Sequence, residues 1–263
     1  MCVNRLYFPA GDEPPTASYI LLFFGDSPLR VAIIVQARMG SERLPGKVML
    51  PIGNKPLIGH LLESLLHCKA TSEIIVATTR DPIDDAIVAY CDQQDLVSYR
   101  GEESNVASRF YELAASHTWD AFVRVSADSP LLDHQLIDQA ISLFGSGPFD
   151  LVTNIFPRTF PHGQSVELLR TETFLKDYSQ MRTATELEHV TSFFYNHASD
   201  YAIHNLTSQE NFSHLQMAVD LPQDLEVAKS VVERMQRPIW TYSLKERIRF
   251  WEQEQRFVGR QAA

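Results

Sequence analysis

The stretch VAIIVQARMGSERLPGK, residues 31–47, decides how this chain folds. Its first five residues are apolar and mostly β-branched, which favours a strand buried on both faces. The strand then runs into a polar loop that carries two glycines and three cations, Arg38, Arg43 and Lys47. In α/β proteins such a loop binds phosphate, because backbone N–H groups approach the anion where glycine lacks a Cβ, while Arg and Lys add charge. The sequence therefore predicts an anion-binding loop at the end of a buried strand.

This loop differs from the common phosphate-binding motifs. A Walker A loop has four residues between its glycines and a Ser or Thr after its lysine. Here five residues separate Gly40 from Gly46, and Val48 follows Lys47. The loop does not read GxGxxG either. The plainer alternative is a surface loop with solvated charges, but the coincidence of strand, glycines and cations favours anion binding.

Downstream of the loop, apolar strands alternate with amphipathic helices. Strands are expected at 73–79, 96–99, 121–125 and 150–154, and helices at 57–67, 81–91, 105–116 and 130–144. This alternation predicts a three-layer α/β/α fold in which helices cover both faces of a mainly parallel sheet. In such sheets ligands bind outside the carboxyl ends of the strands. We therefore expect Arg38, Arg43, Lys47, Arg80 and Asp128 on one side of the molecule.

The second half of the chain is less regular. A strand is expected at 166–169, helices at 171–180, 184–198, 221–235 and 244–257, and a pair of antiparallel strands at 201–205 and 215–219. We interpret residues 30–263 as one domain with a C-terminal helical elaboration. Residues 1–29 are expected to be an irregular extension, because Pro9, Gly11, Pro14 and Pro15 disfavour regular structure.

The composition narrows the classes of function. The net charge is −10, from 33 acidic and 23 basic residues, which argues against a nucleic-acid partner bound through a broad basic face. The apolar run Tyr19–Phe24 is far too short to span a membrane, so no membrane association is expected. The three cysteines form no CxxC pair and no metal-ligand spacing, which fits a cytoplasmic protein. Two of them, Cys68 and Cys91, lie in helical patterns and are expected to be buried apolar residues.

Two aspartates follow predicted strands. Asp128 stands in VSADSPLLD and Asp220 in AVDLPQDLE. A carboxylate at a strand end can bind Mg²⁺, which takes one or two protein carboxylates and completes its shell with phosphate oxygens and water. The alternative for Asp220 is a helix N-cap, and the alternative for Asp128 is a turn residue.

Several motifs resemble those of one enzyme family. QARMGSERLPGKVMLPIGNKPLI, residues 36–58, is similar to the opening signature of sugar cytidylyltransferases, above all the spore-coat polysaccharide branch related to the 3-deoxy-manno-octulosonate and acylneuraminate enzymes. Six further segments follow in order: 73–85, 99–112, 122–133, 160–169, 186–196 and 218–231. The resemblance implies a nucleotide-diphospho-sugar-transferase-like fold. It also implies an Mg²⁺-dependent enzyme that joins an acidic or amino sugar to CTP and releases pyrophosphate, for a surface polysaccharide or glycan.

The resemblance also implies roles for individual residues. The nucleotide would contact Ala37, Arg38, Gly40, Ser41, Arg43, Lys47, Thr78 and Arg80, with Lys47 and Arg43 catalytic. Asp128 and Asp220 would bind the metal. The sugar pocket would contain His162, Gly163, Glu167, Glu188 and His189, although both histidines have a structural alternative and Glu188 could be a solvated helix charge. Ser126-Ala127 stands where the octulosonate enzymes have Gln-Gly, so the choice of base stays open.

Two other classes of function are weighed against this one. A glycosyltransferase of related fold would use an already activated sugar and would not need three cations for a terminal phosphate. A non-catalytic nucleotide-sugar-binding protein would not need to retain Asp128, Lys47 and Arg43 together. The expected partners are CTP or another NTP and a sugar, with a homodimer as an option.

Overall fold

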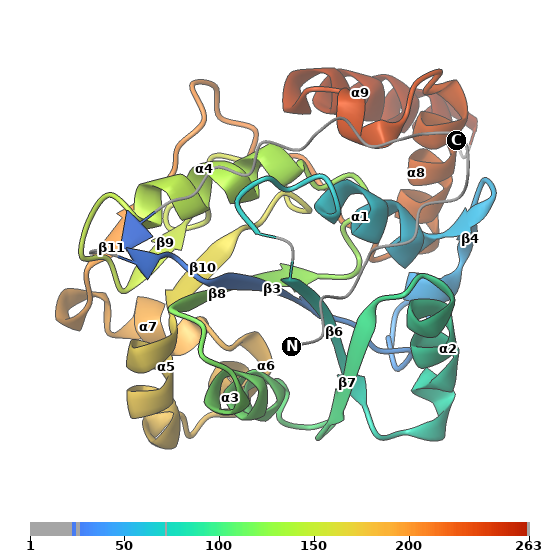
Figure 1. Cartoon of the computed structure of the whole chain (residues 1–263). Helices are drawn as coiled ribbons and strands as arrows, with labels where there is room; N and C mark the ends of the chain where they lie inside the picture. Colours follow the sequence, from blue (N-terminus) through green and yellow to red (C-terminus); the bar gives the residue numbers. More distant parts are fainter. Residues whose placement is uncertain (1–22, 25–26, 72, 262–263) are drawn as a thin grey trace.

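A seven-stranded sheet runs through the middle of the molecule (Figure 1). The computed structural model describes residues 23–24, 27–71 and 73–261. The strand order is β11-β9-β10-β8-β3-β6-β7. The strands are β3 (Val31–Gln36), β6 (Glu73–Thr79), β7 (Val97–Gly101), β8 (Ala121–Ser126), β9 (Leu151–Thr153), β10 (Glu167–Arg170) and β11 (Ile203–Asn205).

The centre of the sheet is parallel, as predicted. β3 pairs in parallel with β6 and β8, and β6 pairs in parallel with β7. β10 runs antiparallel between β8 and β9. The first five residues of β3 are all buried, which explains their continuous apolar sequence.

Helices cover both faces of the sheet, which confirms the three-layer architecture. One face holds α1 (Leu57–Leu65), α2 (Asp85–Gln93) and α4 (His134–Phe144), and the other holds α3 (Val106–Ser116), α5 (Thr171–Asp177), α6 (Ala184–His189) and α7 (Ser192–Asn196). The alternation along β3 assigns the two faces: Ile33 and Val35 pack with the first group, and Ile34 packs with the second. Cys68 and Cys91 are buried in the first core, as expected.

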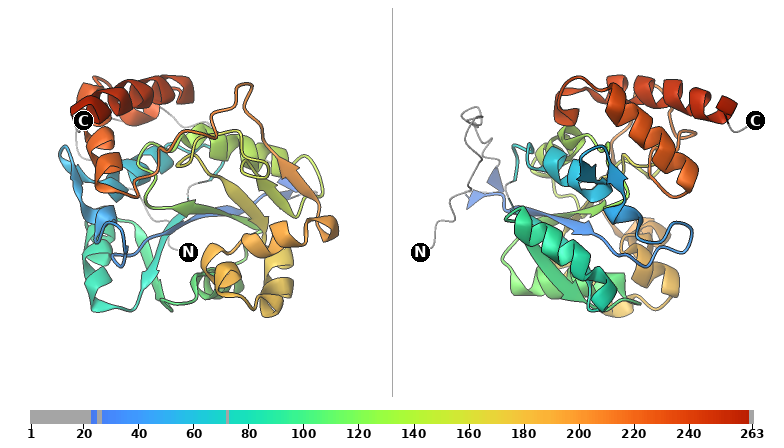
Figure 2. Two further views of the ribbon diagram at one scale, coloured as in Figure 1. Left: turned by 180° about the vertical axis from the view of Figure 1, so that it is seen from behind. Right: turned by 90° about the vertical axis from the view of Figure 1, so that its right-hand side faces the viewer.

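Two helices, α8 (Pro222–Arg234) and α9 (Leu244–Gln261), occupy the C-terminal part of the described chain. Figure 2 shows the two helices together at one corner of the molecule, beyond α1. They bury a third apolar cluster, in which Trp251 and Ile248 of α9 pack with Leu131, Met217 and Val219. This cluster joins the C-terminal helices to two loops that lead to the predicted metal ligands.

Three expectations for the second half are wrong. β11 is parallel to β9, not antiparallel. Residues 215–219 form no strand of the sheet, since Leu215 and Met217 bond to His162 through an isolated parallel bridge and Val219 bonds to Asp128. The helix expected at 184–198 breaks into α6 and α7 at Val190, whose φ of 48° no helix can contain.

Short elements complete the description. β1 (Phe23–Phe24) pairs with β2 (Ser27–Pro28), so these four residues are not irregular as predicted, while residues 1–22 lie outside the described residues. β4 (Pro51–Ile52) and β5 (Lys55–Pro56) form a small hairpin before α1. Within the part of the chain that the structure describes, no helix has the length and apolarity needed to cross a bilayer.

Candidate active site

A cavity of about 530 Å³ opens at the carboxyl ends of β3 and β8. The end of β3 contributes Gln36 and Ala37, and the end of β8 contributes the segment Ser126–Asp128. The loop at 38–47 forms one wall with Val48, and α3, α6, Arg124 and Asp220 complete the lining. The cavity therefore lies where ligands bind in open α/β sheets.

The loop at 38–47 is folded back on itself. The carbonyl of Met39 accepts hydrogen bonds from the N–H groups of Ser41 and Gly46, at 2.8 and 2.9 Å. Gly46 has a φ of 70°, a conformation that glycine adopts without strain, and it delivers the chain to a short 3-10 turn that begins at Lys47. The glycine at 46 thus turns Lys47 into the cavity.

Asp84 anchors the start of this loop to the neighbouring strand. One carboxylate oxygen accepts the N–H of Met39 at 2.8 Å, and the other accepts the hydroxyls of Thr78 and Thr79. Burial alone would raise the pKa of Asp84, but the hydrogen bonds from Thr79, Met39 and Thr78 outweigh it and hold the pKa below its usual value. Thr78 is fully buried in this network, and it does not line the cavity as predicted.

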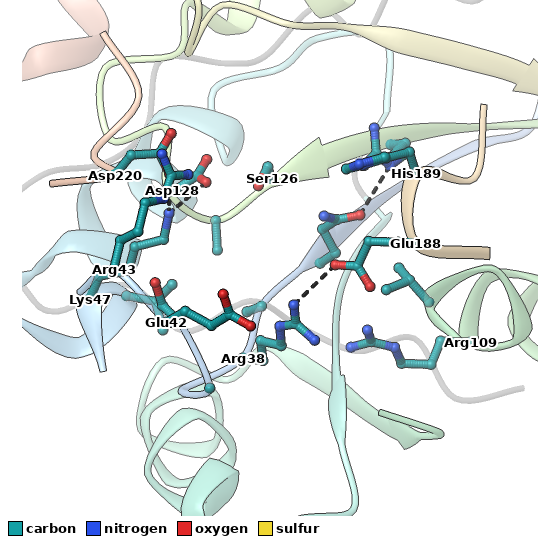
Figure 3. A pocket seen from close by; sticks show the side chains of 18 residues that line it. Arg38, Glu42, Arg43, Lys47, Arg109, Ser126, Asp128, Glu188, His189 and Asp220 are labelled. Carbon is teal, nitrogen blue, oxygen red and sulfur yellow. Dashed lines mark hydrogen bonds and ion pairs between the residues drawn. The ribbon is translucent and has the colours of Figure 1, made fainter. Parts of the chain in front are cut away.

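Lys47 lies between the two predicted metal ligands. Its Nζ is 2.9 Å from Oδ2 of Asp128 and 2.8 Å from Oδ1 of Asp220 (Figure 3). Burial alone would lower the pKa of the Lys47 ammonium, but the two carboxylates outweigh it and raise the pKa above its ordinary value. Burial opposes ionisation of Asp220 too, yet Lys47 and Arg43 hold the pKa of that carboxyl below its usual range. The structure therefore brings Asp128 and Asp220 together across one ammonium group.

The helix-cap alternative for Asp220 is wrong. The N-cap of α8 is Leu221, and Asp224 accepts the backbone N–H groups of Asp220 and Leu221. The carboxylate of Asp220 instead faces the cavity, where Arg43 Nη2 lies 3.0 Å from it and Gln216 donates to its second oxygen. Its carboxylate therefore belongs to the charged network of the cavity and does not cap α8.

The far end of the cavity carries a second cationic group (Figure 3). Arg38 pairs with Glu188 of α6 at 3.1 Å, and Arg109 of α3 lies beside this pair. Arg109 is only 2% exposed, and its Nε has no hydrogen-bond partner among the described residues. Burial and the nearby Arg38 lower the pKa of Arg109. A buried, under-paired guanidinium at a cavity wall is suited to an anionic or carbonyl group of a ligand.

The floor of the cavity is a charged network. Arg124 of β8 pairs with Glu167 of β10 and donates to the side-chain oxygen of Gln36 at 3.0 Å. The other oxygen of Glu167 accepts the hydroxyls of Thr191 and Tyr195. Glu167 is therefore fully used inside the protein, and it does not line the cavity.

The predicted site residues divide into two groups. The cavity is lined by Ala37, Arg38, Gly40, Ser41, Arg43, Lys47, Asp128, Asp220, Glu188 and His189. Outside its lining lie Thr78, Arg80, His162, Gly163 and Glu167. Arg80 points to solvent, 66% exposed, with its nearest charge on Glu112 at 4.0 Å. Ligand contact by these five residues has no support from the geometry.

Three charged lining residues, Glu42, Arg109 and Arg124, were not predicted as site residues. Glu42 lies between the two cationic ends of the cavity in Figure 3. A signal for Arg109 was present in the sequence. Arg109 falls three residues after Val106, on the helix face that also buries Phe110. A cation on a buried helix face needs a partner, and this need marks Arg109 as a candidate site residue.

The carboxylate pair fits a hard divalent cation. No group of three or more His, Cys, Asp or Glu suited to a metal occurs in the described ranges 23–24, 27–71 and 73–261. Mg²⁺, however, needs only one or two carboxylates when phosphate oxygens and water fill its other positions. Two carboxylates that already converge on one cation, beside a loop with three cationic side chains, match that donor set.

Comparison with known proteins adds to the geometry. Residues 32–258 match the family model described as cytidylyltransferase. The chain is 29% identical over 214 residues to the spore coat polysaccharide biosynthesis protein SpsF of Bacillus subtilis, covering 78% of this chain and 87% of the relative. It is 36% identical over 114 residues to a 3-deoxy-manno-octulosonate cytidylyltransferase of Geotalea daltonii, which covers 43% of this chain and 44% of the relative.

A solved structure agrees. A cytidylyltransferase from Leptospira borgpetersenii superposes with a TM-score of 0.82 at 27% identity, over 88% of this chain and 97% of that one. The resemblance stated from the motifs and the predicted enzyme class are thereby confirmed. The matched segment runs from the second residue of β3 into α9 and includes every residue that lines the cavity. This chain belongs to the cytidylyltransferase family.

Proposed function

We propose that this enzyme transfers a cytidylyl group from CTP to an acidic sugar, for the synthesis of a surface polysaccharide. The observation that carries the proposal is the position of Lys47, whose ammonium joins a glycine-containing cationic loop to two convergent carboxylates. The family match supports nucleotidyl transfer from CTP. The names of the relatives, a spore-coat polysaccharide protein and an octulosonate enzyme, support the acceptor class.

The chemistry requires a substitution at the α-phosphorus of CTP. A sugar hydroxyl oxygen forms the new P–O bond, the α–β anhydride bond breaks, pyrophosphate leaves, and the hydroxyl proton passes to solvent. Such transfers depend on positioning and on stabilisation of charge that develops on the leaving group. Lys47 and Arg43, which already lie at one end of the cavity, are placed to contact the leaving phosphates.

Asp128 and Asp220 would hold Mg²⁺. Bound there, the ion would neutralise phosphate oxygens and so reduce their repulsion with the two carboxylates. The protein contributes the fixed distance between those carboxylates. Arg43 and Lys47 balance their charge.

The far end of the cavity favours an acidic acceptor over an amino sugar. Three guanidinium groups, Arg38, Arg109 and Arg124, border it, against the carboxylate of Glu188 and that of the buried Glu167. A carboxylate on the ligand would complete the unpaired hydrogen-bonding capacity of Arg109. The unpaired, buried Cys68 and Cys91 support a cytoplasmic location.

The decisive experiment measures pyrophosphate release by the purified full chain with Mg²⁺. Each NTP is tested against 3-deoxy-manno-octulosonate, an acylneuraminate, an amino sugar and a neutral sugar phosphate. We expect release only with CTP and an acidic sugar. Release with a neutral sugar phosphate alone would overturn the acceptor assignment. Transfer from a nucleotide sugar without pyrophosphate release would identify a glycosyltransferase, and binding without turnover would identify a non-catalytic protein.

A further inference from the structure

We propose that the loop His162–Gln164 fixes the relative positions of the two metal-binding carboxylates, Asp128 and Asp220. The loop does not form part of the sugar pocket. The inference rests on the proposed function, because it assigns positioning residues to the Asp128–Asp220 pair. None of the three loop residues lines the cavity, and His162 is exposed to solvent. His162 and Gly163 contact the segment before Asp220, and Gln164 bonds the turn after Asp128.

The backbone bonds of His162 fix the chain segment that ends at Asp220. The N–H of His162 donates to the carbonyl of Leu215 at 2.9 Å, and the N–H of Met217 donates to the carbonyl of His162 at 2.8 Å. These bonds replace the sheet partners that residues 215–219 lack. They fix the extended segment that ends at Asp220.

Gly163 permits this close approach. Its φ is 89°, and a Cβ on it would lie 2.5 Å from the backbone nitrogen of Ala218 and 2.6 Å from the carbonyl carbon of Met217. Both atoms belong to the main chain, so they cannot move aside as a flexible side chain can. A side chain at 163 would therefore push the segment before Asp220 away from the loop.

Gln164 makes the contacts that lead to Asp128. Its side chain is fully buried. Its Nε2 donates to the carbonyl of Leu131 at 2.7 Å, and its Oε1 accepts the N–H of Asp133 at 2.9 Å. The side-chain amide of Gln164 thus bonds the turn that follows Asp128 at two points, Leu131 and Asp133, on either side of Leu132.

A buried arginine completes the support. Arg247, in the first turn of α9, donates to the carbonyls of Leu131 and Leu132 at 3.1 and 2.7 Å, and it has no solvent exposure. The two aspartate segments also bond to each other directly, because the N–H of Val219 donates to the carbonyl of Asp128 at 2.9 Å. Leu131, Met217 and Val219 share one apolar cluster, which keeps water away from these bonds.

This arrangement sets the separation and direction of the carboxylates. Groups that orient metal ligands from behind typically change metal affinity by roughly 10–100-fold when they are removed. A residue that merely stabilised the fold would change thermal stability without a selective change in metal affinity. The two roles can therefore be separated by measuring both quantities on the same variants.

The test uses Gln164→Met, which keeps the length of the side chain and removes both hydrogen bonds. Binding of Mn²⁺ to the full chain is followed by the electron paramagnetic resonance signal of the free ion, and the Mg²⁺ concentration for half-maximal pyrophosphate release is measured in parallel. We expect Mn²⁺ affinity to fall on the order of 10-fold, with the same shift in the Mg²⁺ requirement and an unchanged KM for the sugar. The matched control is Thr173→Val in α5, which removes a buried hydrogen bond to Asp150 far from the cavity. It should leave Mn²⁺ affinity unchanged.

Two outcomes separate this inference from the proposed function. Asp128→Asn is the reference, because it removes a proposed ligand. If Asp128→Asn loses Mn²⁺ binding while Gln164→Met retains wild-type affinity, the positioning role is refuted and the metal site stands. If Asp128→Asn itself binds Mn²⁺ normally, the metal assignment is refuted as well.

A second variant tests the same positioning role in case Gln164→Met does not fold. Gly163→Ala disturbs the contact between this loop and the segment before Asp220, whereas Gln164→Met disturbs its contact with the turn after Asp128. It should weaken Mn²⁺ binding in the same direction as Gln164→Met if both variants retain the wild-type circular dichroism spectrum. A raised KM for the sugar with unchanged Mn²⁺ affinity in either variant would assign the loop to the sugar pocket and overturn the inference.

Discussion

Replacing Lys47 by methionine removes one charge from the centre of the proposed site and leaves the size of the side chain almost unchanged. The Lys47 side chain is 12% exposed and pairs with Asp128 and Asp220 at 2.9 and 2.8 Å. If Lys47 acts on the leaving pyrophosphate, its loss removes about 2.7–4 kcal/mol of transition-state stabilisation, as for other preorganised donors. At about 1.4 kcal/mol for each factor of ten, kcat should fall about 100- to 1,000-fold.

The same variant should also lose stability, with a defined dependence on pH. A hydrogen bond to a charged group contributes roughly 1.5–3 kcal/mol net, and desolvation of the ammonium offsets part of two such bonds, so we expect a loss of about 1–3 kcal/mol at neutral pH. The pKa of Asp220 lies below its ordinary value of 3.8, so its contribution is present above that pH and disappears as the pH falls through the folded-state pKa. The pKa of Lys47 is raised above 10.5, so its contribution is present below that pH and disappears as the pH rises through the folded-state value. The stability difference between wild type and variant should therefore be largest between these limits.

Two measurements check this prediction. Pyrophosphate release under saturating CTP and sugar gives kcat, and urea unfolding at pH 7 and pH 3 gives the two stabilities. Lys229→Met is the control, because Lys229 forms only a surface pair with Glu226 and its removal should change stability by about 0.5 kcal/mol or less. A kcat within a factor of about three of wild type would refute the role of Lys47 at the leaving group. A stability loss of equal size at pH 3 would refute the electrostatic argument.

The remaining predictions concern the carboxylates, the loop anchor and the N-terminal segment. Asp220→Asn should fold normally and lose turnover, with partial recovery at high Mg²⁺; lower stability with intact turnover would contradict its role at the metal. Asp84→Ala should raise the KM for CTP, because the N–H of Met39 loses its anchor, and should cost about 1–3 kcal/mol of stability in urea unfolding; an unchanged KM would show that the phosphate loop holds its shape without it. Removal of residues 1–28 should leave the melting temperature nearly unchanged, because Leu29, which packs against the core, is retained; a large decrease would show that the removed segment contributes to the core.

The sequence alone determined the parts of this protein that depend on local pattern. The buried strand at 31–35, the loop with Gly46 and Lys47, and the aspartate after β8 could all be predicted, because burial on both faces and glycine's freedom leave a mark on neighbouring residues. The alternation of strands and helices then determined the parallel sheet and the edge at which the site lies.

Tertiary structure decided what each remaining charge and apolar run contacts. Residues 215–219 have the pattern of a strand, but their backbone partners are His162 and Asp128, which lie more than fifty residues away. In the sequence Glu167 has the character of an available carboxylate, but in the folded chain it pairs with Arg124 of the adjacent antiparallel strand. Local sequence encodes dihedral preference and the direction of burial, whereas the partner of a buried polar group depends on segments that meet only in the folded chain. For that reason the glycine-containing cationic loop at 38–47 could be found from the sequence, and the contacts among the segments that carry Asp128 and Asp220 could not.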